Sequence, residues 1–517
     1  MTETKAQNEA RNEERITPAD LDPGEEALES CIIVILGASG DLTVRKIIPA
    51  LYSLSLTQAF KRPLQIVGTG RTTMSDHEFR MRMRETMTAR EGFNEAAWAD
   101  FAGQLHYRPI LYDDISSYSA LAGYLRELDR NSGTGGNRIF YLAVPPSLYQ
   151  VSVKMIGRAG LAAEGADGNG WSRIVVEKPF GRDLETAMSL DQSLHEYFDE
   201  HQIFRIDHYL TKETVQNVLM FRFANAVFEP IWNRRYIDYV KITAAESLGV
   251  EHRAGYYEQA GVLRDMFQNH MMQLLAMTAM DPPSTFEADR VRDEKVRVFR
   301  SLRPFPVDNL NEFIILGQYT RGVADGKEAA GYREEPGVSR KSLIPTYASL
   351  KIFVDNWRWQ GVPFYLTSGK RLSEKLTEVA IQFKMVPHSM FRQTLGKEIA
   401  ANRLTLGIYP DEKISLAFQA KTPGAKINLK TMTMDFNYRQ NYSGPLMEAY
   451  EKVLLDCILG DHMLFWRQDG VELCWAFLTP ILNACETCED RIEMLKPYKA
   501  GSSGPAFFPE QVGPLNA

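Results

Sequence analysis

The stretch CIIVILGASGDL, residues 31–42, decides the fold of this 517-residue chain. Residues 31–36 are apolar without interruption, as is typical of a parallel strand that is buried on both faces. Gly37 ends this predicted strand, and a helical pattern with Leu42, Ile47 and Leu51 follows at once. A glycine turn between a buried strand and a helix can bind the pyrophosphate of a dinucleotide. Because the spacing is G-x-x-G rather than G-x-G-x-x-G, a plain strand-to-helix turn remains the alternative interpretation.

Later runs extend this pattern into an α/β domain over residues 31–207. Apolar runs of strand length recur at 64–68, 139–144 and 174–176, with helical segments between them. Strands that alternate with helices are typical of a doubly wound parallel sheet. The sequence therefore predicts a Rossmann-like domain.

Residues 208–517 predict a second, larger α+β domain. Apolar residues alternate with period two at 379–383, 404–408 and 414–418, which indicates strands with one buried face. These strands follow one another too closely for crossover helices, so we expect a mostly antiparallel sheet. A helical pattern returns at 450–458.

The composition excludes several classes of protein. Hydrophobic residues make up 44% of the chain and charged residues 24%, as in ordinary globular proteins. The net charge is −7, and residues 1–30 hold nine acids and three bases, so the remainder is nearly neutral. A neutral body offers no general basic surface for nucleic acid or an anionic membrane. We expect a disordered acidic tail at 1–30 and a surface loop at 323–339.

The cysteines and the N-terminal residues indicate a reducing compartment. Five cysteines spread over a long chain do not form the pattern of a disulfide framework. No apolar run precedes Cys31, so a secretory signal is not expected. The sequence therefore predicts a cytoplasmic protein.

Two basic residues follow predicted strands of the first domain. Arg71 comes directly after the second strand, and no acid lies between Gln65 and Met74. A cation there favours NADP over NAD, whose ribose usually meets a carboxylate, although Arg71 as a solvated surface residue is the alternative. Lys178 lies in EKPFG, residues 177–181, where ligands meet open α/β sheets. A lysine that merely caps a loop is the alternative there.

Two further motifs hold the groups for acid–base chemistry. RIDHYL occupies residues 205–210, and RDMFQNH occupies residues 264–270 on a helical stretch. A histidine beside Met266 and Phe267 is more often a buried core residue. A carboxylate such as Asp207 would instead orient the ring and stabilise its protonated form, but the residues alone do not place the two side by side.

The motifs GASGDL, EKPFG, RIDHYL and RDMFQNH occur in this order, and together they resemble the glucose-6-phosphate dehydrogenase family over about residues 31–505. The resemblance implies a Rossmann-like coenzyme domain and an α+β domain whose sheet forms a subunit interface. It implies oxidation of C1 of glucose 6-phosphate to 6-phosphogluconolactone with hydride transfer to NADP, the first step of the oxidative pentose phosphate pathway. A homodimer or homotetramer is implied, with no metal, nucleic acid or membrane.

The resemblance also assigns residues. It makes His270 the general base and Asp207 its orienting partner. The implied cofactor contacts are Gly37, Ala38, Ser39, Gly40, Asp41, Leu42, Arg71 and Lys178. The implied substrate contacts are Lys178, His208, Tyr209, Lys212, Glu246, Asp265, Lys370 and Lys375.

Two departures from the family pattern accompany these expectations. Thr211 stands where the family usually has glycine, and Tyr498 is followed by a segment without the arginine that accompanies a second, structural NADP in animal members. We therefore expect no second NADP site.

Three alternatives are weaker. Another NADP-dependent sugar oxidoreductase would usually carry G-x-G-x-x-G and lack the RIDHYL and QNH pair. A non-enzymatic dinucleotide-binding protein would have lost the base or the lysines, which are present here. Thiol chemistry at Cys485 and Cys488 would need a different structural context, so two unrelated cysteines are expected.

Overall fold

The computed structural model describes the chain in segments. The described residues are 28–56, 64–90, 93–165, 170–207, 209–210, 212–324, 326–391, 399–424, 427–437, 447–487 and 491–505. The chain divides into two compact units. Unit 1 is Met1–Lys178, Gln192–His208 and Asn437–Leu464, and unit 2 is Pro179–Asp191, Tyr209–Phe436 and Phe465–Ala517. Among the described helices, none combines the length and the apolar character that a bilayer span requires.

Unit 1 contains the predicted parallel sheet. Its strands are β1 (Ile32–Leu36), β2 (Gln65–Gly70), β3 (Leu105–Pro109), β4 (Arg138–Leu142), β5 (Ser172–Val176) and β6 (Ile203–Ile206). They lie in the order β6-β5-β4-β1-β2-β3, and every neighbouring pair is parallel. The chain winds outward in both directions from β1 and β4, so the topological switch point lies between these two strands. This confirms the doubly wound α/β prediction.

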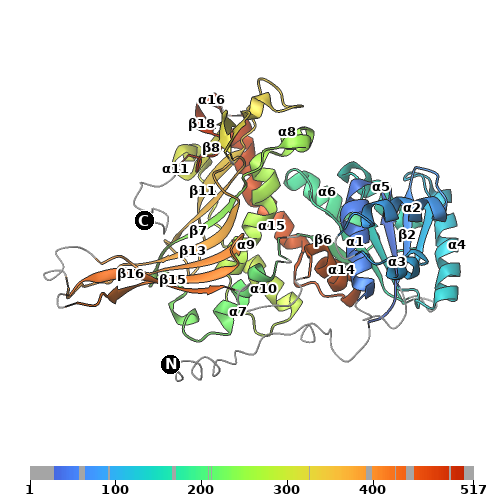
Figure 1. Cartoon of the computed structure of the whole chain (residues 1–517), viewed down its shortest axis with the longest axis horizontal. Coiled ribbons are helices and arrows are strands. Elements are labelled where there is room, and N and C mark those ends of the chain that lie inside the picture. Colours follow the sequence, from blue (N-terminus) through green and yellow to red (C-terminus); the bar gives the residue numbers. More distant parts are fainter. Residues whose placement is uncertain are drawn as a thin grey trace, which may run out of the picture. The chain divides into compact units, whose positions relative to one another are not determined.

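Helices cover the parallel sheet on both sides (Figure 1). They are α1 (Ile48–Leu56), which a π-helical turn (Thr43–Ile47) precedes, α2 (Asp76–Met87), α3 (Glu95–Ala102), α4 (Ile115–Ser132), α5 (Tyr149–Arg158) and α14 (Ala449–Leu459). The helix α6 (Leu184–His195) begins in unit 2 and ends in unit 1. Ser75 and Glu78 form a capping box at the start of α2. The late helix α14 packs on α1, so a segment from far along the chain completes unit 1.

Unit 2 is built on a large curved sheet (Figure 1). Its strands lie in the order β16-β15-β14-β13-β7-β12-β11-β8-β18. Their bounds are β7 (Ile237–Ala245), β8 (Ile314–Thr320), β11 (Tyr347–Phe353), β12 (Pro363–Gly369), β13 (Leu376–Phe383), β14 (Arg403–Tyr409), β15 (Lys413–Lys421), β16 (Leu429–Asn437) and β18 (Leu495–Lys499). Most pairs are antiparallel, but β12 pairs in parallel with β7 and β18 with β8. The mostly antiparallel second sheet is confirmed.

The helices of unit 2 lie against this sheet. They are α7 (Glu213–Phe223), α8 (Ala254–Val262), the π-helix η7 (Leu263–Met271), α9 (Met272–Ala279), α10 (Ala288–Arg300), α11 (Leu310–Phe313), α15 (Gln468–Thr487) and α16 (Arg491–Met494). The π-helix contacts β12 on one side and α15 on the other. Its side chains are almost all buried, which places the QNH motif inside the unit.

Two segments differ from the expectations. The stretch 323–339 is not a simple surface loop: β9 (Gly322–Ala324) and β10 (Lys327–Ala329) pair within it, and Tyr332 is fully buried. Most of the expected tail lies outside the described residues, but Leu28 and Ser30 at its end are both 6% exposed. Burial of the Tyr332 ring and of the Leu28 side chain is favourable, because apolar surface is removed from water. This burial anchors the two segments.

Arg222 connects α7 with the C-terminal end of α9. Its side chain is fully buried and donates to the carbonyl oxygens of Met277 at 3.0 Å and Met280 at 2.8 Å. It also donates to Glu229 Oε2 at 3.1 Å. Carbonyl groups at a helix end have no partner within the helix, so this guanidinium satisfies acceptors that would otherwise be buried unpaired.

Replacing Arg222 with alanine should lower the free energy of unfolding by about 3 kcal/mol, because buried acceptors lose their donor. Equilibrium unfolding in urea measures the change. Arg300→Ala, in the exposed last turn of α10, is the control and should change the free energy by less than about 0.5 kcal/mol. Equal effects of the two substitutions would contradict this role of Arg222.

Candidate active site

The glycine turn after β1 has the backbone geometry of a phosphate-binding turn. Gly37 has φ +92°, and a Cβ atom there would lie 2.3 Å from the carbonyl oxygen of Ala143, which follows β4. The N–H groups of Gly37 and Ala38 both donate to the carbonyl oxygen of Thr69 at 2.9 Å. A helix begins at Asp41. Only glycine fits at position 37, and the turn lies at the switch point where open α/β sheets bind ligands.

Arginines from two elements lie near this turn. Arg71 follows β2 and is exposed, as the sequence predicted. Arg82, on α2, donates from Nη2 to the carbonyl oxygen of Ser39 at 2.7 Å. Sequence reasoning missed Arg82, since an arginine inside an exposed helix gives no signal of its own. Its proximity to the turn is nevertheless expected for a residue on the helix that directly follows β2.

Glu177, next to Lys178, is held by tyrosine side chains. The hydroxyl of Tyr141 donates to Glu177 Oε1 at 2.6 Å, and that of Tyr450 donates to the same oxygen at 3.2 Å. Tyr149 donates to the Glu177 carbonyl oxygen at 3.1 Å. Burial raises the pKa of the Glu177 carboxyl group, against the lowering effect of the two hydroxyls. These contacts fix the backbone beside Lys178, whose side chain is half-buried.

The RIDHYL motif contributes to both units. Asp207 follows β6 in unit 1 and is 1% exposed. His208 and Thr211 lie outside the described residues. Tyr209 belongs to unit 2, where its ring stacks on His270 with 4.0 Å between the ring centroids and 22° between the planes. The pairing of Asp207 with His270 stays a prediction.

His270 lies on a π-helix rather than on an ordinary α-helix. Gly261, with φ +59°, interrupts the preceding helix, and the π-helical turns follow from Leu263. The backbone N–H of His270 donates to Asn269 Oδ1 at 2.5 Å, and Asn269 Nδ2 donates to the Asp265 carbonyl oxygen at 3.1 Å. π-Helical turns within helices often mark functional sites. The apolar spacing of the motif predicted a helix but not this wider winding.

Three predicted substrate residues meet at one end of the large sheet. Glu246 follows β7, Lys370 follows β12 and Lys375 precedes β13. In the sheet register Ala245 is opposite both Gly369 and Leu376, so the three side chains start from adjacent backbones. The spacing of these residues in the sequence gave no indication of this register.

Lys370 is surrounded by carboxylates. Its ammonium group forms an ion pair with Glu246 and lies 3.9 Å from Asp265 Oδ2. Tyr256 donates to Asp265 Oδ1 at 3.2 Å. Burial and the charge of Asp265 raise the pKa of the Tyr256 hydroxyl, which keeps it a donor. Since the Lys370 side chain is only 8% exposed, its charge requires these partners.

A second group of positively charged side chains lies near the tyrosine that stacks on His270. Lys212 Nζ lies 4.2 Å from the centre of the Tyr209 ring and 5.5 Å from that of Tyr409. Lys375 Nζ lies 4.3 Å from the centre of the Tyr409 ring. Sequence reasoning missed Tyr409, although it ends a strand with clear period-two alternation. The two lysines and two rings, with His270, form a continuous group in unit 2 that suits an anionic sugar.

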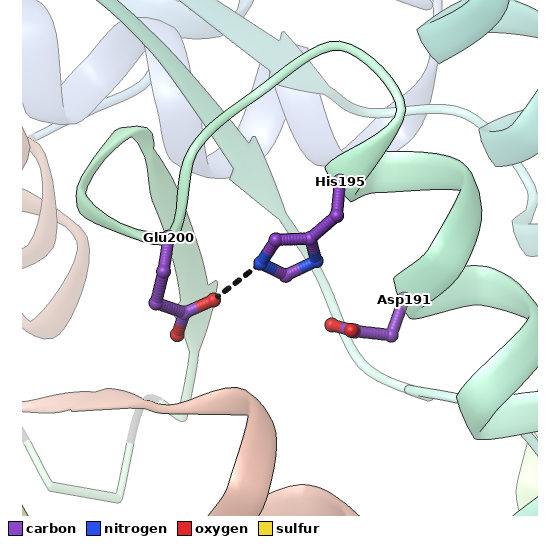
Figure 2. A group of neighbouring side chains, drawn as sticks. All are labelled: Asp191, His195 and Glu200. Atoms are coloured by element: carbon purple, nitrogen blue, oxygen red, sulfur yellow. Dashed lines mark ion pairs between the residues drawn. The ribbon is translucent and has the colours of Figure 1, made fainter.

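A separate group of ionisable side chains lies at the end of α6. Figure 2 shows Asp191, His195 and Glu200, whose ligand-type atoms all lie within 4.8 Å of one another. His195 Nε2 is 3.2 Å from Glu200 Oε2. The guanidinium of Arg205 donates to both oxygens of Glu200, at 2.8 and 3.0 Å. This charge-assisted contact, in which Nη1 of Arg205 reaches both oxygens, balances the carboxylate charge, so we interpret the group as a structural ion-pair network.

Comparisons with known proteins cover nearly the whole chain. Residues 34–217 match the model of the glucose-6-phosphate dehydrogenase NAD-binding domain, and residues 219–512 match that of the C-terminal domain of the same family. The chain is similar to the glucose-6-phosphate 1-dehydrogenases of Aggregatibacter actinomycetemcomitans, with 46% identity over 92% of this chain and 94% of the relative, and of Treponema pallidum, with 45% identity over 92% of each.

Two solved structures of glucose-6-phosphate dehydrogenases are also similar to this chain. A glucose-6-phosphate dehydrogenase in complex with its substrate glucose-6-phosphate superposes with a TM-score of 0.84 and 34% identity, covering 93% of this chain and 96% of that one. The enzyme from Mycobacterium avium superposes with a TM-score of 0.77 and 33% identity, covering 92% and 96%.

The buried carboxyl group of Glu177 predicts a pH dependence of stability. Its pKa is raised in the folded protein, so folding is favoured below the ordinary carboxyl pKa and loses this contribution as pH rises through the folded value. Glu177→Gln does not titrate, so its free energy of unfolding relative to wild type should increase from about pH 4 upward. Urea unfolding of both proteins at several pH values measures this, and a pH-independent difference would contradict it.

Proposed function

This chain belongs to the glucose-6-phosphate dehydrogenase family, and we propose that NADP is its hydride acceptor and His270 its catalytic base. The family membership establishes oxidation of glucose 6-phosphate at C1 to the lactone. The observation that carries the assignment of roles is an arrangement in unit 2. Tyr209 stacks on His270, Lys212 lies over the Tyr209 ring, and Lys370 lies beside Asp265 of the π-helix that carries His270.

The residues of unit 1 fit a dinucleotide with a 2′-phosphate. The turn at Gly37 leaves no space for a side chain, and its helix N-terminus suits a pyrophosphate. Arg71 and Arg82 offer two cations near this turn, where NAD-specific sites use a carboxylate. When bound, NADP supplies the acceptor for the hydride from C1. Lys178, beside the fixed Glu177, contacts the nicotinamide end and the substrate.

His270 takes the proton of the C1 hydroxyl as the C1–H bond breaks. Asp207 orients the ring and stabilises the imidazolium that forms. The Tyr209 ring, stacked on the imidazole, limits its rotation and excludes water from one face. These roles require a buried histidine, and His270 is 1% exposed.

The residues around Lys370 bind the hydroxyl groups of the sugar phosphate, and a separate group of lysines binds its phosphate. Glu246 and Asp265 accept hydrogen bonds from sugar hydroxyls, and the ammonium group of Lys370 lies beside both carboxylates. Lys212 and Lys375, which both lie near the Tyr409 ring, attract the phosphate together with His208. A near-neutral protein can bind a dianion only through such a local group.

We also propose a homo-oligomer that forms through the large sheet. Strand β16 exposes Met432, Met434 and Phe436 by 46%, 61% and 47%. Neighbouring apolar side chains exposed on a strand favour association. A dimer or tetramer and a cytoplasmic location remain predictions from the resemblance and the cysteine pattern.

Replacing His270 with asparagine should reduce kcat by roughly 10²–10⁴-fold, because shape and polarity persist but the base is lost. The KM for glucose 6-phosphate should change much less. Steady-state rates, with circular dichroism to confirm folding, make the measurement. A folded variant with near-normal kcat at neutral pH would show that His270 is not the base.

Replacing Arg71 with alanine should weaken NADP binding by about 10- to 150-fold, the value of one charge-assisted hydrogen bond. Binding of NAD, which lacks the 2′-phosphate, should change little. Isothermal titration with each cofactor measures both affinities. Arg126→Ala, an exposed arginine on α4, is the control and should alter neither. Equal losses for the two cofactors would place Arg71 elsewhere in the site.

A further inference from the structure

The backbone that carries Lys370 is held in a strained conformation. Arg371, the next residue, has φ +53°, a left-handed value that residues with a side chain rarely adopt. Its N–H donates to the Leu248 carbonyl oxygen at 3.1 Å, and its own carbonyl accepts from the Gly501 N–H at 2.8 Å. Strained residues persist only where their surroundings hold them. One of these holding contacts comes from the turn after the C-terminal strand β18.

Tyr498 on β18 holds Lys370 itself. Its hydroxyl donates to the Lys370 carbonyl oxygen at 2.6 Å and lies 3.0 Å from Thr346 Oγ1. The Lys370 N–H donates to the Thr346 carbonyl oxygen at 2.9 Å. Because Tyr498 gives its single hydroxyl proton to the Lys370 carbonyl, Thr346 Oγ1 is the donor in its contact with Tyr498, and it also accepts from the Tyr319 N–H at 3.0 Å. Both backbone polar groups of Lys370 are therefore held by Thr346 and Tyr498.

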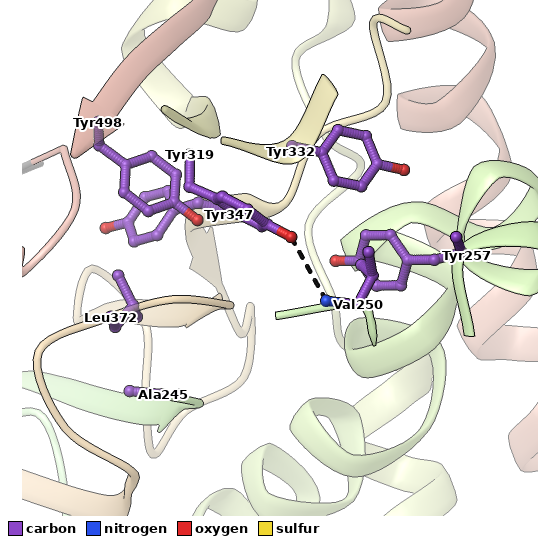
Figure 3. Close-up of a cluster of buried hydrophobic side chains, with 9 residues drawn as sticks. Ala245, Val250, Tyr257, Tyr319, Tyr332, Tyr347, Leu372 and Tyr498 are labelled. Carbon is purple, nitrogen blue, oxygen red and sulfur yellow. Dashed lines mark hydrogen bonds between the residues drawn. The ribbon is translucent and has the colours of Figure 1, made fainter. Parts of the chain in front are cut away.

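Tyr498 belongs to a cluster of buried tyrosines that Figure 3 shows. The other hydroxyls have different partners: that of Tyr332 donates to Glu258 Oε1 at 2.6 Å, and that of Tyr347 donates to the Pro505 carbonyl oxygen at 2.8 Å. The packing of the rings is common to all of them. Among the tyrosines of this cluster, Tyr498 alone contacts the Lys370 backbone in the described hydrogen bonds.

We propose that Tyr498 is a positioning residue for substrate binding, which acts by fixing the backbone of Lys370 so that the ammonium group stays between Glu246 and Asp265. The inference rests on the proposed role of Lys370 in binding glucose 6-phosphate. Without the hydroxyl, the Lys370 carbonyl loses its donor and the strained Arg371 is free to relax. The lysine then spends less time between the two carboxylates, and the sugar hydroxyls meet acceptors that are less well ordered.

Tyr498→Phe should raise the KM for glucose 6-phosphate about three- to tenfold, the loss expected for one neutral hydrogen bond. The affinity for NADP, measured by titration without substrate, should be unchanged. Tyr332→Phe is the matched control: it removes a hydroxyl from the same cluster and should lower the melting temperature without changing KM. If both variants lost stability and neither changed KM, Tyr498 would be merely structural and the proposal would be wrong.

A double-mutant cycle shows whether the effect passes through Lys370. Lys370→Ala should raise KM more than Tyr498→Phe, and adding Tyr498→Phe to it should raise KM no further. Additive effects would overturn the proposal while leaving the role of Lys370 intact. An unchanged KM in Lys370→Ala would instead refute the proposed substrate role, and the inference with it. Thr346→Val, which removes the hydroxyl that supports Tyr498, should raise the same KM by a smaller factor even if Tyr498→Phe does not fold.

Discussion

The parallel pairing of β7 with β12, inside a sheet that is otherwise mostly antiparallel, brings together the residues that we propose for substrate binding. Parallel neighbours end at the same edge, so Glu246 and Lys370 leave the sheet side by side. Strand β13 pairs antiparallel with β7 and starts where the other two end, which adds Lys375. A shift of the register by one residue would turn each of these side chains to the opposite face. The group of residues that we propose for substrate binding in unit 2 therefore depends on this pairing.

Electrostatics explains why the charged residues near this edge are paired as they are. A buried ammonium group is costly unless carboxylates compensate it, and Lys370 lies between Glu246 and Asp265. Two carboxylates around one lysine leave hydrogen-bond acceptors suited to hydroxyl groups. Lys212 and Lys375 lie instead over tyrosine rings, which attract a cation without carrying a charge of their own. In the proposed function, these two environments bind the hydroxyl groups and the phosphate of the substrate, respectively.

Much of the fold could be predicted from the sequence because its periodicities are local. The continuous apolar run before Gly37 predicted a buried parallel strand, and alternation around Val379 and Leu404 predicted the second sheet. The association of α14 with unit 1 could not be predicted, because an amphipathic helix does not indicate which surface it covers. The π-helical winding at His270 was also missed, since apolar spacing hardly distinguishes it from an α-helix.

The site was predicted less completely, because most of its contacts join residues that are distant in sequence. Motif resemblance named His270, Lys370 and Lys212, and the structure brings the last to the Tyr209 ring that stacks on His270. Arg82, Tyr409 and Tyr498 act through contacts that no spacing rule encodes. The register between β7, β12 and β13 likewise follows from packing of the whole sheet rather than from any one strand.

The most direct measurement follows the absorbance band of reduced nicotinamide after the purified protein is mixed with glucose 6-phosphate and either NADP or NAD. With NADP the band should grow rapidly, NAD should give a lower kcat/KM, and the reaction should be far slower when glucose replaces its phosphate ester. A preference for NAD, or equal kcat/KM values for glucose and glucose 6-phosphate, would contradict the proposed function.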